Sequence, residues 1–210
     1  IWASRQSRAS RYTSCMNLVV AFEAILVVCC LISLNLARQS FFPASLFWAF
    51  GVVTIGVAAA LGGFKFAGFS GLESYHTLAK HFAGSIGIAS FALGALAGLL
   101  ANFFIRFHWW ILLVVILLLC AVLLLDTWRF PAQIQLGLVG LILLVGVIRL
   151  ISSGLLAIYL LLGVACLILS DIATRWLAVN TGMAEVNIYH VLLSLAVISF
   201  GLSASRDNWE

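Results

Sequence analysis

The chain has 210 residues, of which 64% are hydrophobic and 9% are charged, and its formal net charge is +4. No soluble fold of this length could cover so much apolar surface, and the mean hydropathy of +1.20 excludes soluble enzymes and nucleic-acid-binding domains. The apolar stretches are long and lack the two-residue alternation of barrel strands, so the sequence predicts an all-α integral membrane protein.

Seven stretches are predicted to cross the membrane, because a hydrocarbon core about 30 Å thick needs about 20 helical residues per crossing. They lie between a polar N-terminal flank, residues 1–14, and a polar tail, residues 204–210, so that the membrane domain covers residues 15–203. The predicted transmembrane helices are residues 15–36, 47–63, 72–102, 111–125, 134–151, 154–177 and 186–203. The short connections leave no room for a soluble domain.

The basic residues predict the orientation of this multi-pass protein. Three arginines precede the first span, and positive charge favours the cytoplasmic side. With the N-terminus inside, the cytoplasmic set is Arg5, Arg8, Arg11, Lys65, Arg129 and Arg175, and the opposite set is Arg38, Arg106, Arg149 and Arg206. We therefore expect a cytoplasmic N-terminus, and seven spans place the C-terminus on the other side.

Two segments of the chain resemble each other and suggest an internal repeat. A shift of 114 residues pairs Tyr75 with Tyr189, His76 with His190, Ser85 with Ser199 and Gly87 with Gly201. The same shift places the first predicted span on the fifth and the second approximately on the sixth, so the possible repeats are residues 15–102 and 134–203, with residues 111–125 as a linker helix. A single linker span makes the two halves parallel, in a three-plus-one-plus-three arrangement. Chance similarity between helices of like composition is the alternative explanation.

The start of the third predicted span is unusually polar. Helical spacing places Glu73, His76 and Lys80 on one face together with small residues such as Gly87, and small residues permit close packing of helices in membranes. We expect this face to point into the bundle. His81 lies about 140° around the helix from His76 at 3.6 residues per turn, so the two histidines are poorly placed to share one ligand.

Several ionisable residues are predicted to meet at one membrane face. Under the predicted topology Glu73, His76, Asp171 and His190 lie at similar depth, with Glu23 somewhat deeper. Ionisable side chains within spans are costly and commonly mark functional sites, so we predict Glu73 and Asp171 as catalytic residues. The alternative is structural: Asp171 could pair with Arg175, and Glu73 with His76 or Lys80, four or fewer residues away.

The same cluster has the residue types of a zinc site. His76, His190 and Asp171 come from three predicted helices, and a catalytic zinc takes three protein ligands and an open position for water. Bound zinc lowers the pKa of that water to about 7, which suits hydrolysis near neutral pH. A haem held between His76 and His190 is a rival use of the same pair.

Seven spans with His, Ser and Asp near the ends of the third, sixth and seventh resemble the superfamily that joins alkaline ceramidases with the progestin and adiponectin receptors. Thr77-Leu-Ala-Lys-His81 resembles its Ser-x3-His motif, and Val186-Asn-Ile-Tyr-His190 resembles its His-x3-His motif with the first His replaced by Val. The resemblance implies a zinc site and chooses His81, not His76, as a ligand. The Asp expected shortly after the first motif is absent.

Three functions remain open from the sequence. The first is a metal-dependent hydrolase of a lipid amide or ester, with the bilayer and a lipid substrate as partners. The second is a carrier of a small solute, coupled to protons, whose two repeats rock about the polar cluster. The third is a non-catalytic subunit of a larger membrane complex, because no complete catalytic motif is present.

Overall fold

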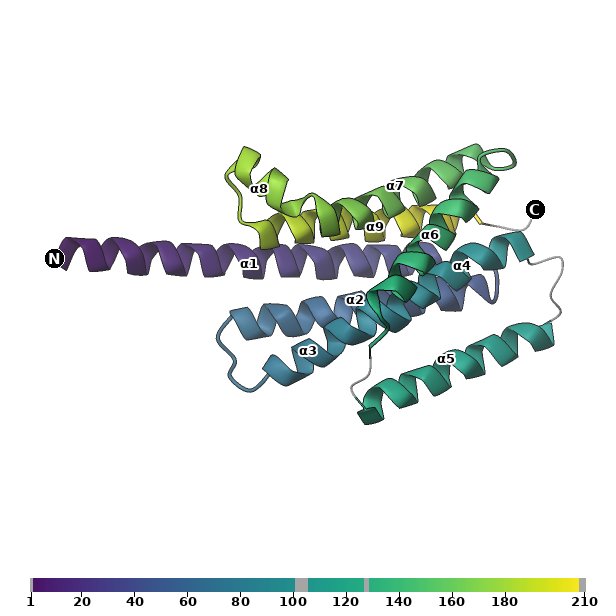
Figure 1. Cartoon of the computed structure of the whole chain (residues 1–210), viewed down its shortest axis with the longest axis horizontal. Coiled ribbons are helices and arrows are strands. Elements are labelled where there is room, and N and C mark those ends of the chain that lie inside the picture. Colours follow the sequence, from purple (N-terminus) through teal and green to yellow (C-terminus); the bar gives the residue numbers. More distant parts are fainter. Residues whose placement is uncertain (1, 101–105, 127–128, 208–210) are drawn as a thin grey trace.

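The structure of the chain is a computed structural model that describes residues 2–100, 106–126 and 129–207, apart from the side chains of residues 2–17, 106, 124 and 126. All regular elements in these ranges are helices. They are α1 (Trp2–Ala37), α2 (Ala44–Phe66), α3 (Glu73–Phe82), the π-helical turn η1 (Ala83–Gly87), α4 (Ile88–Leu100), α5 (Arg106–Asp126), α6 (Ala132–Arg149), α7 (Gly154–Ile172), α8 (Thr174–Thr181) and α9 (Glu185–Ser205) (Figure 1).

The membrane-spanning helices confirm an all-α, multi-pass protein but not the predicted number of spans. Within the described ranges, six helices are long and apolar enough to cross a membrane: Leu18–Ala37, Ala44–Phe66, Glu73–Leu100, Ala132–Arg149, Gly154–Ile172 and Glu185–Ser205. The predicted fourth span, residues 111–125, falls in α5, whose described apolar stretch Phe107–Leu123 is shorter. Helix α5 itself covers 21 residues, so a seventh span stays a prediction beside the six that the described residues show.

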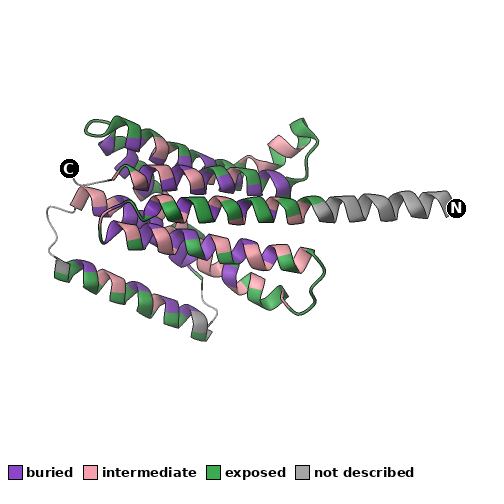
Figure 2. Cartoon of the chain, turned by 180° about the vertical axis from the view of Figure 1, so that it is seen from behind, coloured by how far each residue is buried: buried purple, intermediate pink, exposed green. Residues whose placement is uncertain are grey.

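The helices run back and forth along the long axis of the molecule. α1 begins and α9 ends at opposite ends of the molecule, and α5 returns the chain alongside the bundle so that α4 and α6 run in the same direction (Figure 1). Which end faces the cytoplasm stays a prediction, as does the internal repeat. Figure 2 shows buried residues concentrated where the helices face one another and exposed residues on the outer faces. Many of the exposed residues are large and hydrophobic, as expected for faces that meet lipid.

Helix α9 is the centre of the bundle because small residues allow its neighbours to approach closely. It packs along both α1 and α7. The Ser33 hydroxyl of α1 donates a hydrogen bond of 2.7 Å to the Val197 carbonyl, and a Cβ at Gly201 would collide with Ser33. Close approach and hydrogen bonds of this kind replace the hydrophobic effect, which does not drive helix association in lipid.

Three aromatic rings fill the middle of the bundle. Ring centroids lie 5.9 Å apart for Trp48 and Phe91, 5.9 Å for Trp48 and Phe200, and 4.9 Å for Phe91 and Phe200. Each ring packs against a glycine of a neighbouring helix: Phe91 on Gly51, Trp48 on Gly94 and Phe200 on Gly163. This aromatic cluster forms a dense layer across the bundle and separates its two ends.

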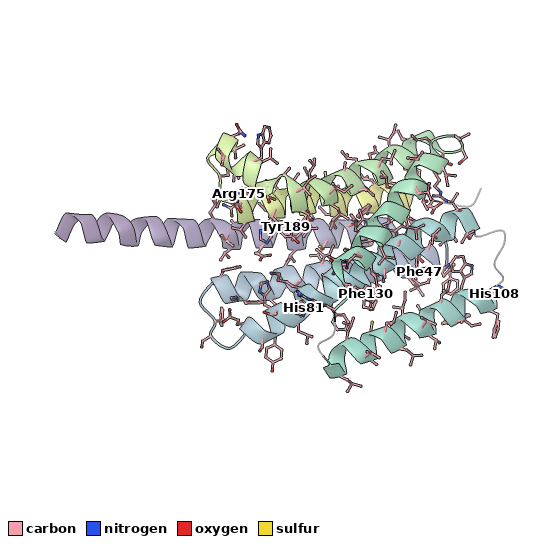
Figure 3. The ribbon with its side chains drawn as sticks, viewed as in Figure 1. Phe47, His81, His108, Phe130, Arg175 and Tyr189 are labelled. Carbon is pink, nitrogen blue, oxygen red and sulfur yellow. The ribbon has the colours of Figure 1, made fainter. Side chains whose placement is uncertain are left out.

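Helix α6 starts partway along the bundle, not at its end. Phe130 lies just before α6 (Figure 3). Its backbone N–H donates a 3.0 Å hydrogen bond to the Ser85 hydroxyl of η1. From there α6 packs on α4 and α7. In the described part of the chain α3 packs on α2 and has no comparable contact with α7 or α9. The bundle is thus closed by α6 beyond η1 but open between α3 and α7 before it.

A buried ion pair fastens the end of the bundle where α9 finishes. Arg149, the last residue of α6, and Asp207, just after α9, are joined by a 3.0 Å contact, with their side chains 8% and 12% exposed. Burial raises the pKa of the Asp207 carboxyl above its usual value, and the Arg149 guanidinium opposes that rise. Gly98 of α4 leaves the space for both side chains, since a Cβ there would collide with the guanidinium.

We expect Gly98→Ala to lower the free energy of unfolding by about 1–3 kcal/mol, because the added methyl group forces the ion pair apart. Thermal unfolding of the purified protein in detergent, followed by tryptophan fluorescence, measures this. Gly137→Ala on α6 is the matched control, because a Cβ at Gly137 meets no atom within 4 Å. Equal melting temperatures for the two variants would show that the ion pair does not fasten this end.

Candidate functional site

A carboxylate and an imidazole meet inside the bundle near the end where α3 and α9 begin. Glu23 Oε1 of α1 lies 3.1 Å from His190 Nε2 of α9, and the two side chains are only 3% and 8% exposed. A lone carboxylate buried at this depth would be strongly destabilising, so a partner is required. Contact with His190 therefore explains how the first span can contain the buried carboxylate of Glu23.

The backbone fixes how His190 presents its ring. Its Nδ1 lies 2.6 Å from the carbonyl oxygen of Val186, one turn earlier in α9. A carbonyl oxygen only accepts hydrogen bonds, so Nδ1 must carry the hydrogen. The other nitrogen, Nε2, is therefore the one that faces Glu23 and can exchange a proton with it.

His76 of α3 completes this cluster, and Gly62 of α2 makes the space for it. A Cβ built on Gly62 would collide with Glu23 Oε1 and would lie 3.1 Å from His76 Nε2. The two polar atoms therefore share the space beside this glycine. His76 is also close enough to interact electrostatically with both Glu23 and His190. We refer to Glu23, His76 and His190 as the polar cluster.

The polar cluster lies at one end of a cavity of about 450 Å³. Its polar lining is Glu23, His76, Lys80, Tyr189 and His190, and its apolar lining includes Leu26, Ile55, Ala58, Ala59, Phe66, Ile88, Phe91, Leu167, Val186 and Leu193. The volume falls within the range of about 300–1,000 Å³ found for small-molecule sites, and a mainly apolar lining with a few convergent polar groups is typical of them.

The cavity runs from exposed to buried residues. Lys80, Val186 and Tyr189 are exposed, whereas Leu26 and Phe91 at the apolar end are buried in the core. Because the lining includes η1 on one side and Leu167 of α7 on the other, the cavity lies behind the opening that α6 leaves uncovered. In Figure 3, Tyr189 marks the side of this region formed by α9. A molecule in the bilayer could enter here.

The structure brings together two of the residues predicted from the sequence and leaves three outside. His76 and His190 both line the cavity. Glu73, predicted as catalytic, has a side chain 79% exposed and pairs with Lys65 at 3.0 Å. Asp171, predicted as a catalytic residue and zinc ligand, is exposed near the end of α7, and neither it nor His81 lines the cavity. Glu23 is the carboxylate that lines the cavity beside the two histidines.

The described residues contain no group of three His, Cys, Asp or Glu side chains that could hold a metal ion as they stand. The predicted ligand Asp171 does not line the cavity that the two histidines line. The polar cluster has the residue types that zinc accepts, but its atoms are arranged as a paired Glu and His beside a second His. Zinc binding therefore stays a prediction.

The function has to be argued from the cavity itself. No protein-family model, curated protein or solved structure matches this chain. The resemblance to the superfamily of alkaline ceramidases and progestin and adiponectin receptors stays a prediction. What the residues establish is a membrane bundle with a buried acid–base pair at the end of an apolar cavity.

Proposed function

We propose that this protein is a membrane hydrolase that acts on the amide or ester bond of a lipid-like molecule bound in the cavity. The observation that carries the proposal is the position of the Glu23–His190 pair, 3.1 Å apart, at the polar end of an otherwise apolar cavity. An apolar chain lying against Ile55, Phe91 and Leu193 leaves its polar end beside this pair. The opening between α3 and α7 supports entry from the bilayer.

The pair provides the proton transfer that hydrolysis needs. Glu23 takes a proton from a water molecule as the water oxygen adds to the carbonyl carbon of the substrate, and the carbon–oxygen or carbon–nitrogen bond then breaks. His190 returns the proton to the departing alcohol or amine through Nε2, while the Nδ1 hydrogen bond to Val186 holds its ring in place. His76 is placed to stabilise the charge that develops on the carbonyl oxygen.

If the protein binds zinc, the polar cluster would have to rearrange to hold it, because its side chains form no metal-binding group as they stand. Glu23, His76 and His190 are the described cavity-lining residues of the types that bind zinc, and the Nδ1 bond of His190 is the kind of contact that orients metal-bound histidines. Zinc bound there would acidify a water molecule and polarise the carbonyl group. Metal analysis of the purified protein, before and after His190→Ala, tests this point separately from hydrolysis.

Hydrolysis is tested directly with the purified protein in lipid nanodiscs. We expect release of fatty acid, measured by mass spectrometry, from at least one member of a panel of single-chain amides and esters. The release should saturate with substrate and depend on His190. A panel with no turnover above that of empty nanodiscs, at any pH from 5 to 9 or so and with zinc added, would contradict the proposal.

A second candidate function is a carrier of small solutes. The observation that favours it is the contrast between the two ends of the bundle: one opens into the cavity and the other is closed by the buried Arg149–Asp207 pair. A carrier needs such an end to open in turn. Counterflow of a radiolabelled solute in proteoliposomes, without conversion of the solute, would favour this function over hydrolysis.

A further inference from the structure

We propose that the cavity accepts a single-chain amphiphile with an anionic headgroup, and that Lys80 binds that headgroup. This inference names the substrate class of the same cavity and so rests on the proposed function. Three observations support it: the charge at the open end of the cavity, the depth of Lys80 along α3 and the volume of the cavity.

Lys80 is the unpaired cation of the cavity. It lines the cavity, its residue is exposed, and no ion pair joins it to any carboxylate in the described part of the chain. The neighbouring cation at this end, Lys65, is already bound to Glu73 at 3.0 Å. An ammonium group at a cavity entrance without a protein partner is available to a ligand of opposite charge.

The negative charge of the cavity lies elsewhere. Glu23 is the one carboxylate among the lining residues that the structure describes, and it is buried and paired with His190. The open end is therefore positive, with Lys80 beside His76. A cationic headgroup would be repelled there, whereas a carboxylate or phosphate would gain a charge-assisted hydrogen bond.

The position of Lys80 suits a headgroup at the membrane surface. Lys80 is two turns into α3, about 10 Å from its start at a rise of 1.5 Å per residue. Lysines at this depth extend along the apolar surface so that the ammonium group reaches the headgroup level. A ligand bound to it would have its chain directed past Ile88 and toward Phe91, which belongs to the buried aromatic cluster.

The volume of the cavity favours a ligand with a single hydrocarbon chain. At about 450 Å³ the cavity lies in the lower half of the range of about 300–1,000 Å³ for small-molecule sites. Its apolar end is closed by buried side chains, Leu26 and Phe91 among them. A two-chain lipid would have to leave one chain in the bilayer, whereas a single-chain molecule fits with its headgroup at Lys80.

Equilibrium binding to the whole protein in nanodiscs tests the inference. The probes are a fluorescent long-chain fatty acid and the fluorescent alcohol of equal chain length. We expect Lys80→Gln to weaken binding of the acid by about tenfold, as for the loss of one charge-assisted hydrogen bond, and to leave the alcohol unchanged. Lys80→Arg should retain binding of the acid. Arg175→Gln is the matched control, because Arg175 is an exposed cation of α8 that does not line the cavity.

Each outcome decides the inference. Equal losses for acid and alcohol, no loss for either, or the same loss in Arg175→Gln would overturn it. Lysophosphatidic acid and inorganic phosphate serve as competitors, and displacement by phosphate alone at the same concentration would show that the chain is not recognised. The proposed hydrolysis is judged separately, since His190→Gln should stop turnover and leave Lys80-dependent binding of the acid intact.

Discussion

Glu23→Gln is expected to reduce hydrolysis by about 10²–10⁴-fold, the range that general acid–base catalysis supplies. The amide keeps the size of the side chain and one oxygen that accepts a hydrogen bond, but it cannot take a proton from water. His190→Gln should reduce the rate to a similar extent, because Glu23 and His190 form one unit through their 3.1 Å contact. Initial rates of fatty-acid release at saturating substrate measure both effects.

The controls for this experiment are the residues that the sequence placed in the site and the structure places outside it. Glu73→Gln loses only an exposed pair with Lys65, and His81→Gln changes a residue that does not line the cavity. Both should hydrolyse at rates within about twofold of the unmodified protein. If Glu73→Gln or His81→Gln stops the reaction while Glu23→Gln does not, the reacting groups lie outside this cavity.

Gly62→Ala should be nearly as damaging to activity as Glu23→Gln, although the substitution adds a single methyl group. The new Cβ would occupy the space that Glu23 Oε1 and His76 Nε2 share, so the carboxylate must move away from His190. Alanine is a better helix former than glycine, so α2 itself gains from the change. We expect a loss of about 10²-fold or more in rate, with no loss of folded protein on size-exclusion chromatography.

Gly63→Ala is the matched control, because it makes the same change one residue away. A Cβ at Gly63 would lie 3.6 Å from the Cβ of Glu23, an ordinary contact that displaces nothing. Its rate should stay close to that of the unmodified protein. Similar rates for the Gly62 and Gly63 variants would mean that the geometry of the polar cluster does not govern the reaction.

The meeting of His76 and His190 in one cavity could be predicted, because the depth of a residue in the membrane follows from its position in a span. His76 and His190 each lie within the first two turns of a helix that starts at the same end of the bundle. In apolar surroundings such side chains turn inward, where polar partners offset the cost of burial. The sequence therefore predicted that these two residues belong to one site.

The predicted carboxylates Glu73 and Asp171 do not line the cavity of the two histidines, because equal depth does not fix the direction in which a side chain points. Glu73 and Asp171 lie at helix ends, where water is near and a lysine or solvent satisfies their charge. Glu23 is buried away from water, so its carboxylate must face a polar partner inside the bundle. The cost of burying Glu23 was visible in the sequence. Giving that cost more weight than proximity to the histidines would have placed Glu23 in their cavity.

The point at which α6 begins could not be predicted from an apolarity pattern. The residues of α5 are as apolar as those of the other spans, and only the hydrogen bond from Phe130 to Ser85 shows that α6 begins partway along the bundle. A tertiary contact between residues 45 positions apart leaves no periodic trace in the sequence. The opening to the cavity, which depends on that contact, could not be predicted.

The π-helical turn η1 sets the alignment of one whole wall of the cavity. His76, Lys80, Gly84 and Ile88 line the cavity at steps of four residues. On a continuous α-helix each such step would drift by about 40°, since successive residues are about 100° apart. The wider turn at Ala83–Gly87 takes up this drift and keeps the four residues in one row. Deleting one residue of this turn would leave the hydropathy, the helix content and membrane insertion almost unaltered. It would, however, rotate His76 and Lys80, before the turn, away from Ile88, after it. The shape of this cavity wall is thus encoded partly as a length, one residue more than a regular helix would need.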